Sequence, residues 1–133
     1  VLHQVDLFHR LIHDLSFTIE IVVCQTVRED SGLAMSSRNQ RLSAEGKQKA
    51  AQIYAYISRL AVDFSSGFSW EECIEIAQVV CLSDVPELTV EYIELVEYPS
   101  LLPVKGEYLA ANSYAICFAG YLEEVRLIDN IVF

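Results

Sequence analysis

A group of hydroxyl and guanidinium side chains at residues 36–38 is the part of this sequence best suited to chemistry. Ser36 and Ser37 stand directly beside Arg38. Two neighbouring hydroxyls can donate hydrogen bonds into a small volume, and arginine adds a rigid, permanently charged fork that fits phosphate oxygens. Gly32 allows the backbone to turn sharply just before them. On residue type alone, the stretch is either a polyphosphate site or an ordinary polar loop.

The distribution of charge bears on that choice. The 133-residue chain has a net charge of −10, which argues against general affinity for nucleic acid or for anionic membranes. Five of its nine Lys and Arg nevertheless lie within residues 28–49, together with only three acidic residues. Such a cationic cluster in an acidic chain indicates a small anionic ligand. For Lys47 and Lys49, the solvated face of a helix is the better interpretation.

Other sequence features bear on metal binding and location. The four cysteines form no CxxC pair and no zinc-like spacing, so we expect reduced thiols. His9 and His13 are four residues apart and could share a helix face, but no third ligand follows at a useful spacing. We expect an exposed helix face there and no protein-bound metal. No apolar run reaches the length of a membrane span and no signal peptide opens the chain, so a cytoplasmic location is expected.

Helices and strands with clear local signals surround the polar stretch. Apolar spacing predicts a helix over residues 5–15, and the β-branched run at residues 18–24 predicts a largely buried strand. Residues 25–42 lack periodicity and are expected to form a long functional loop. Ser43 should cap a helix that ends near residue 65, and Ser69 with Glu72 forms a capping box for a second helix. Three strands are then predicted at residues 88–96, 108–118 and 125–133, the last two joined around Gly120.

The predicted order of elements is that of an α/β chain with two unequal parts. A helix followed by a buried strand is half of an α/β unit, so the opening residues resemble the end of something larger. Two helices on a three-stranded, mostly antiparallel sheet then form a small α+β domain.

Two stretches of the sequence resemble one enzyme family. The run TVREDSGLAMSSRNQRLS, residues 26–43, is similar to the segment that leads into the C-terminal domain of pantothenate synthetases, which are pantoate–β-alanine ligases. Residues 126–130, RLIDN, resemble the characteristic terminus of the same family. The resemblance implies that residues 1–26 are the tail of a Rossmann-like nucleotidylyl-transferase domain and that residues 27–133 are a C-terminal lid domain.

The resemblance also implies a reaction and a set of site residues. The family condenses pantoate with β-alanine through a pantoyl adenylate, using ATP with Mg²⁺ and releasing AMP and pyrophosphate, and the full-length parent is expected to be a homodimer. Catalysis and triphosphate binding would fall to the polar stretch, and Arg38 would stabilise the departing pyrophosphate. The residues assigned by resemblance are Ser36, Ser37 and Arg38 for the triphosphate, Val27 and Met35 for the nucleoside, and Gln4 for pantoate.

Several positions depart from the family pattern. Val1, Leu2 and His3 stand where the family has an aspartate, an aromatic residue and a glutamine, and the family's HxGH motif is missing. Glu123 occupies a position where glycine is expected. We therefore expect no ligase activity from this chain alone. The main alternative is a non-catalytic binding domain that kept the fold and lost the chemistry, and a third is a free-standing anion-binding module. An HxGH motif upstream of Val1 would favour the enzyme.

Overall fold

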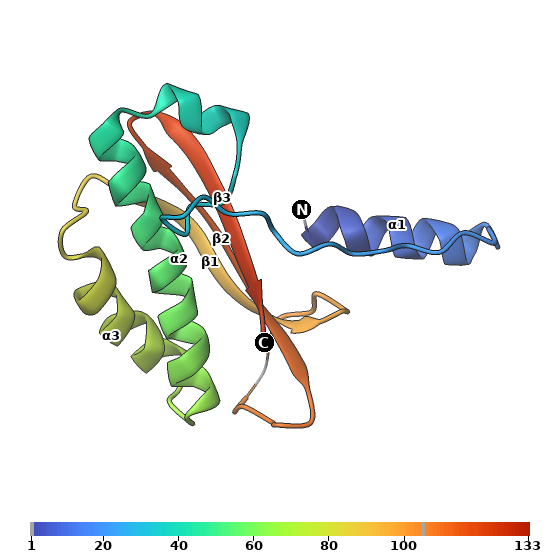
Figure 1. The fold of residues 1–133 in the computed structure, drawn as a ribbon. Coiled ribbons are helices and arrows are strands. Elements are labelled where there is room, and N and C mark those ends of the chain that lie inside the picture. Colours follow the sequence, from blue (N-terminus) through green and yellow to red (C-terminus); the bar gives the residue numbers. More distant parts are fainter. Residues whose placement is uncertain (1, 105) are drawn as a thin grey trace.

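The computed structural model describes residues 2–104 and 106–133, so the comparison drawn for Val1 lies outside it. The elements follow one another as α1 (Leu2–Asp14), the 3₁₀-helix η1 (Ser37–Arg41), α2 (Ala44–Ser65), α3 (Trp70–Leu82), β1 (Thr89–Tyr98), β2 (Ser113–Leu122) and β3 (Val125–Val132). Figure 1 shows α2 and α3 on one face of the sheet, while α1 projects away from these elements. We call the described residues from 26 onward, which include η1, α2, α3 and the sheet, the body. We call residues 2–25, which include α1, the arm.

The predicted helix starts are confirmed. The Ser43 hydroxyl accepts a hydrogen bond from the Gly46 backbone N–H at 2.9 Å and so caps α2. At the start of α3, Ser69 and Glu72 exchange both hydrogen bonds of a capping box. Gly67 lies just beyond α2 with a φ of +95°, a left-handed conformation that glycine adopts without strain.

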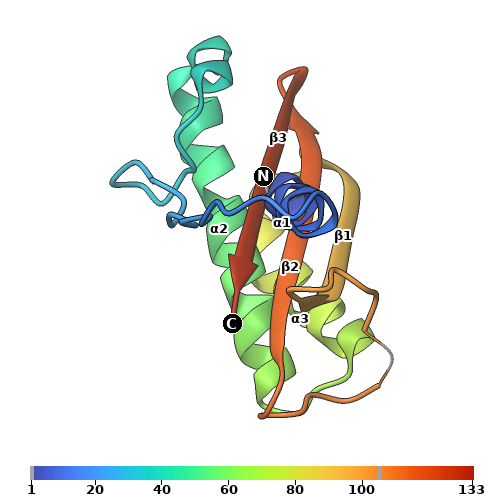
Figure 2. The ribbon, with the colours of Figure 1, turned by 90° about the vertical axis from the view of Figure 1, so that its right-hand side faces the viewer.

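The three strands form an antiparallel sheet in the order β1-β2-β3, which confirms the predicted small domain (Figure 2). Ile116 of β2 lies opposite Leu95 on one side and Ile131 on the other. The predicted turn around Gly120 is wrong, because Gly120 lies inside β2. The chain turns instead at Glu123 and Glu124, whose φ values of 49° and 61° are those that a two-residue hairpin loop requires.

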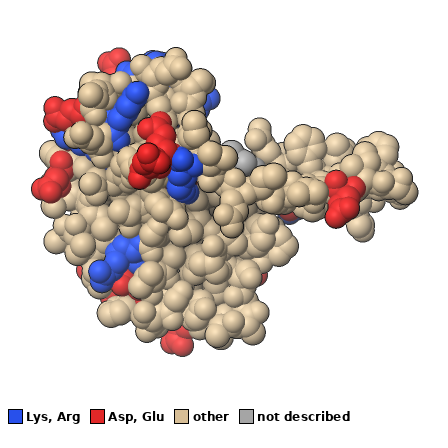
Figure 3. Space-filling model, viewed as in Figure 1, with Lys and Arg blue, Asp and Glu red and all other residues tan. Residues whose placement is uncertain are grey.

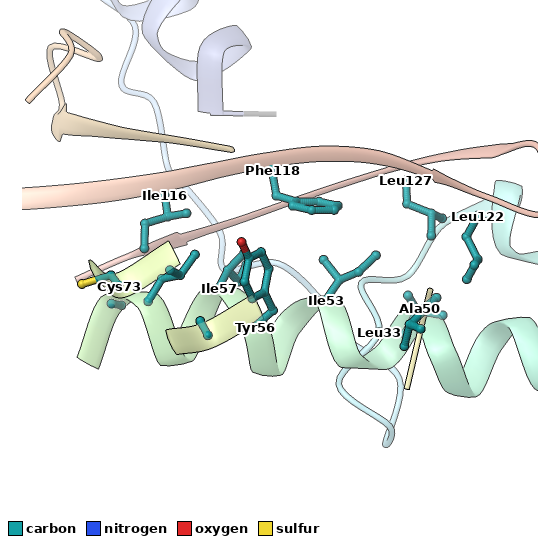
Figure 4. Close-up of a cluster of buried hydrophobic side chains, with 14 of the residues drawn as sticks. Leu33, Ala50, Ile53, Tyr56, Ile57, Cys73, Ile116, Phe118, Leu122 and Leu127 are labelled. Atoms are coloured by element: carbon teal, nitrogen blue, oxygen red, sulfur yellow. The ribbon is translucent and has the colours of Figure 1, made fainter. Parts of the chain in front are cut away.

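The core lies between α2 and the sheet. Figure 4 shows Ile53, Tyr56 and Ile57 of α2 directed toward side chains of β2 and β3. The rings of Tyr56 and Phe118 meet edge to face with 6.4 Å between their centroids. Phe64, at the other end of α2, is 1% exposed and makes edge-to-face contacts with several rings, those of Trp70, Tyr108 and Tyr114.

The helix predicted at the start of the chain is confirmed as α1, but it buries none of its residues. The strand predicted at residues 18–24 is wrong: the segment forms no β-ladder, and Val22 is 77% exposed. A β-branched run becomes a strand only where another backbone offers hydrogen bonds, and no described segment pairs with it. Phe8, Leu11 and Ile19 help to line an apolar groove of about 430 Å³ between the helix and this segment.

The arm exposes many large apolar side chains, among them Phe8, Leu15 and Ile19, each more than half exposed. Figure 3 shows charged side chains of both signs spread over the body, while the visible face of the arm carries almost none. Among the described residues, no helix combines the length and the apolar character needed to cross a bilayer.

Candidate active site

Residues 27–35 fold into a tight hairpin rather than an irregular loop. The Met35 N–H donates to the Val27 carbonyl at 2.9 Å, and the Glu29 N–H donates to the Leu33 carbonyl at 2.8 Å. Gly32 closes the turn with a φ of +90°, so its predicted role in a sharp turn is confirmed. The hairpin therefore gives the residues that follow a fixed starting point.

Arg28 ties this hairpin to the last strand. Its guanidinium donates to both carboxylate oxygens of Asp129, at 2.7 and 2.9 Å, and to the Gly32 carbonyl at 3.1 Å. The same group lies 3.6 Å from the centroid of the Tyr54 ring. Burial acts to lower the pKa of Arg28, but the hydrogen bond and charge of Asp129 outweigh it, and the pKa is raised. The two stretches that resemble the ligase family are thus in direct contact.

Residues 36–38 form an exposed turn on this base. Ser36 is extended, with φ −154° and ψ 142°, and its hydroxyl oxygen accepts a hydrogen bond from the Arg38 N–H at 3.2 Å. The helix η1 begins at Ser37. All three side chains are exposed, and Arg38 pairs with no carboxylate among the residues that the structure describes. A guanidinium and two hydroxyls therefore face solvent together.

A cavity of about 180 Å³ adjoins the turn. Met35, Ser36 and Arg38 line one side of it, and β3 residues, including Ile128 and Asn130, line the other. The structure thus brings three of the sequence-predicted site residues to one cavity. A small polar ligand has cationic, hydroxyl and apolar contacts available there.

The other predicted site residues lie elsewhere. Ser37 and Val27 do not line this cavity, although each is next to a lining residue in the sequence. The Val27 carbonyl already accepts the hydrogen bond from the Met35 N–H. Gln4 is exposed on α1 and is likewise not among the lining residues. If Gln4 contributes to a site, it does so from the arm rather than from the body.

The cationic cluster predicted at residues 28–49 divides into structural and free charges. Arg28 pairs with Asp129, and Lys49 bridges Glu45, at 2.8 Å, and Glu87. Hydrogen bonds that the Lys49 ammonium donates to these carboxylates, to Glu45 first, raise the pKa of Lys49. The exposed Arg38 is the cation that remains beside the cavity.

Sequence reasoning missed three residues of this region. Arg28, Asp129 and the buried Asn39 hold the turn in place, yet none was singled out as a site residue. One signal was available: Asp129 interrupts an apolar strand pattern, and a carboxylate in such a position needs a partner. Within the described part of the chain, no group of three His, Cys, Asp or Glu side chains is arranged to hold a metal ion.

Comparisons with known proteins bear directly on this site. The family model described as Pantoate-beta-alanine ligase matches residues 2–132. The chain is 41% identical over 131 residues to the pantothenate synthetase of Cytophaga hutchinsonii, covering 98% of this chain and 46% of that protein. It is 37% identical over 129 residues to the bifunctional pantoate ligase/cytidylate kinase of a Synechocystis species, covering 97% of this chain and 25% of that protein.

Solved structures agree with the sequence matches. The pantothenate synthetase of Thermus thermophilus superposes with a TM-score of 0.81 at 35% identity, covering 96% of this chain and 45% of that one. The ligase of Francisella tularensis, crystallised with beta-gamma ATP and beta-alanine, gives a TM-score of 0.57 at 29% identity, with 97% and 39% covered. The chain spans less than half the length of these relatives. Because the family model covers nearly every residue, this chain belongs to the pantoate–β-alanine ligase family.

Proposed function

We propose that this chain is the C-terminal portion of an ATP-dependent ligase that joins pantoate to β-alanine and yields pantothenate, AMP and pyrophosphate. Family membership over residues 2–132 supports the reaction class. The observation that carries the assignment to this region is the exposed Arg38 beside two hydroxyls on a firmly held hairpin, where no described carboxylate pairs with it. The Francisella tularensis relative, crystallised with beta-gamma ATP and beta-alanine, supports those two substrates.

The reaction proceeds in two displacements. The pantoate carboxylate attacks the α-phosphorus of ATP, a P–O bond forms to give pantoyl adenylate, and pyrophosphate leaves. The uncharged amine of β-alanine then attacks the acyl carbon, a C–N bond forms as the C–O bond to the phosphate breaks, AMP leaves, and the nitrogen loses a proton to solvent. Both steps depend on positioning and on neutralising the charge of the leaving group. Arg38 and the hydroxyls of Ser36 and Ser37 supply this at the triphosphate.

The remaining assignments follow from where the residues lie. Met35 and the Val27 backbone would contact the nucleoside, next to the phosphates, and Gln4 would bind pantoate from the arm. ATP and pantoate would then meet between the arm and the body. We assign the Mg²⁺ to the phosphates of the nucleotide, the usual way in which this ion reaches such sites.

The proposed division of the chain places residues 1–26 in the nucleotide-binding domain and residues 27–133 in a lid domain. The apolar side chains exposed on the arm would then pack against the part of the ligase that lies outside this chain. We also propose that the full-length enzyme is cytoplasmic and homodimeric.

Pyrophosphate binding tests the assignment of the turn. We expect the chain to bind pyrophosphate weakly in isothermal titration calorimetry, and Arg38→Ala to weaken that binding about tenfold, the value of one hydrogen bond to a charged group. Arg41→Ala is the matched control, since Arg41 is an exposed arginine three residues away. Equal losses in the two variants, or no binding by the unmodified chain, would contradict the assignment.

Product formation tests the division of labour. The chain incubated with pantoate, β-alanine, ATP and Mg²⁺ should form no pantothenate, because the opposing half of the site is supplied by other residues. Pantothenate formation by this chain alone would overturn that expectation. Pyrophosphate binding combined with an inactive full-length protein would favour the non-catalytic binding domain instead.

A further inference from the structure

We propose that Asn39 is the positioning residue that holds the Ser36–Arg38 turn in its ligand-binding shape, an inference that rests on the function proposed above. The side chain is 3% exposed although the turn before it lies in solvent. Its Nδ2 donates to the Glu29 carboxylate at 3.2 Å and to the Ala34 carbonyl at 3.0 Å. One amide group thus connects the turn to both strands of the hairpin.

The turn has little else to hold it. The helix η1 spans five residues, and Asn39 is its one buried member. The Asn39 N–H donates to the Ser36 carbonyl at 3.1 Å, and the Leu42 N–H donates to the Asn39 carbonyl at 3.2 Å, so its main chain also lies at the centre of the turn. Short 3₁₀ segments have poor hydrogen-bond geometry and need outside support.

The hairpin that Asn39 contacts is itself bound to the sheet. Glu29 and Ala34 belong to the hairpin that Arg28 ties to Asp129 of β3. A series of hydrogen bonds therefore runs from the sheet through the hairpin to Asn39, and from there to the backbone that carries Arg38. The backbone that carries the exposed Arg38 is therefore held by buried and partly buried groups.

The side-chain amide of Asn39 holds the turn through the two hydrogen bonds that its Nδ2 donates. Its Oδ1 is buried and receives no hydrogen bond from any described residue, so the side-chain hydrogen bonds of Asn39 all come from its Nδ2 donors. Both neighbours of Nδ2 are acceptors, which also fixes the orientation of the amide. An aspartate would keep the shape but place a carboxylate oxygen against the Glu29 carboxylate and the Ala34 carbonyl.

Asn39→Asp is therefore the sharpest test, and Asn112→Asp is its control because Asn112 is exposed. We expect Asn39→Asp to weaken pyrophosphate binding about tenfold and the control to leave it within about twofold, as measured by calorimetry at about pH 8. Asn39→Ala, which removes the donors without adding charge, provides the same test if the aspartate variant does not fold.

A double-variant cycle separates positioning from general stability. If Asn39 acts through Arg38, then Asn39→Asp should weaken binding by less than about twofold in an Arg38→Ala background. A purely structural role would lower the thermal midpoint and leave the affinity of the folded protein unchanged. Unchanged affinity in Asn39→Asp, or an equal loss in both backgrounds, would overturn the proposal.

Hydrogen exchange distinguishes failure of the inference from failure of the proposed function. Without ligand, Asn39→Asp should speed hydrogen exchange of the backbone N–H groups at position 39 and at Leu42 about tenfold relative to the control. Both N–H groups donate hydrogen bonds within the turn. Unchanged exchange would overturn the positioning role even if pyrophosphate binds. No pyrophosphate binding by the unmodified chain, with faster exchange in the variant, would overturn the anion site and with it the ligand-directed part of this inference.

Discussion

α1 and α2 are both amphipathic helices, yet they lie in opposite environments. α2 buries nine of its residues against the sheet and α3, whereas α1 buries none. The same contrast holds for the segments that follow them, since the body packs around α2 while residues 18–24 stay largely exposed. An apolar stripe is enough to predict a helix. Its stability depends on what packs against the stripe, and only the body of this chain supplies that itself.

Two arginines repeat this contrast within the site. Arg28 has its side chain 17% exposed and is tied to Asp129, while Arg38, ten positions later, is exposed and pairs with no described carboxylate. One arginine fixes the hairpin and the other is left available for a ligand. Substituting a buried residue and an exposed residue of the same type therefore tests which of the two stabilises the fold.

The largest expected difference is between phenylalanines of the body and the arm. Phe64→Ala should lower the free energy of unfolding by about 3–5 kcal/mol, because Phe64 is buried among aromatic rings. Phe8→Ala, at a side chain that is 58% exposed, should change it by less than about 0.5 kcal/mol. Urea unfolding followed by circular dichroism measures both. Equal effects would show that the arm contributes to the same cooperative unit.

The ion pair beneath the hairpin should give the next largest effect. Asp129→Ala leaves the Arg28 guanidinium without its partner and should cost about 3 kcal/mol in urea unfolding. Arg28→Met combined with Asp129→Leu should cost less, since no unpaired charge remains. Asp6→Ala breaks the helical Asp6–Arg10 pair of the arm and should cost about 0.5 kcal/mol or less. An Asp129→Ala variant as stable as the unmodified chain would refute this anchor.

These buried contacts also mark the limit of prediction from sequence. Helix starts were predictable because Ser43 and the Ser69–Glu72 box act within three residues of themselves. Arg28 and Asp129 are 101 positions apart, and no local sequence pattern predicts that these two residues form an ion pair. The exposed Ser36, Ser37 and Arg38 were found from their chemistry and the family resemblance, and their binding roles stay predictions.

Two predictions from local sequence are wrong. Residues 18–24 have the composition of a strand, but pairing requires a backbone partner that composition does not reveal. The turn predicted around Gly120 is absent there, because Gly120 lies inside β2. The chain turns at Glu123 instead, where the carboxylate accepts hydrogen bonds from the backbone and side chain of Ser43, 80 positions away. The first error reflects a missing backbone partner, and the second coincides with a contact between distant residues.

Removing the arm should have a small effect on stability and a clear one on association. Deletion of residues 1–24 should change the free energy of unfolding of the body by less than about 1 kcal/mol, because α1 buries none of its residues. Light scattering should show concentration-dependent association of the full chain that the deletion abolishes, since the arm exposes a contiguous apolar groove. A monodisperse full chain at high concentration would count against this role of the groove.

The smallest effect concerns the turn between β2 and β3 and appears as a pH dependence. Hydrogen bonds from the Ser43 side chain, and then from its backbone, lower the pKa of Glu123 below its ordinary value of 4.5. A lowered folded-state pKa adds stability that is fully present above the unfolded-state value and is lost as the pH falls through the folded-state value. Glu123→Gln should therefore be less stable than the unmodified chain at about pH 7, and the difference should shrink below pH 4.5.

Glu124→Gln is the neighbouring control for this pH dependence. Glu124 is exposed and makes no side-chain hydrogen bond or ion pair with a described residue, so the substitution should show no such dependence. Thermal unfolding of the three proteins between about pH 7 and about pH 3 measures the difference, because this range spans the titration of glutamate. A constant difference between Glu123→Gln and the unmodified chain across that range would mean that the cap of α2 does not depend on the charge of Glu123.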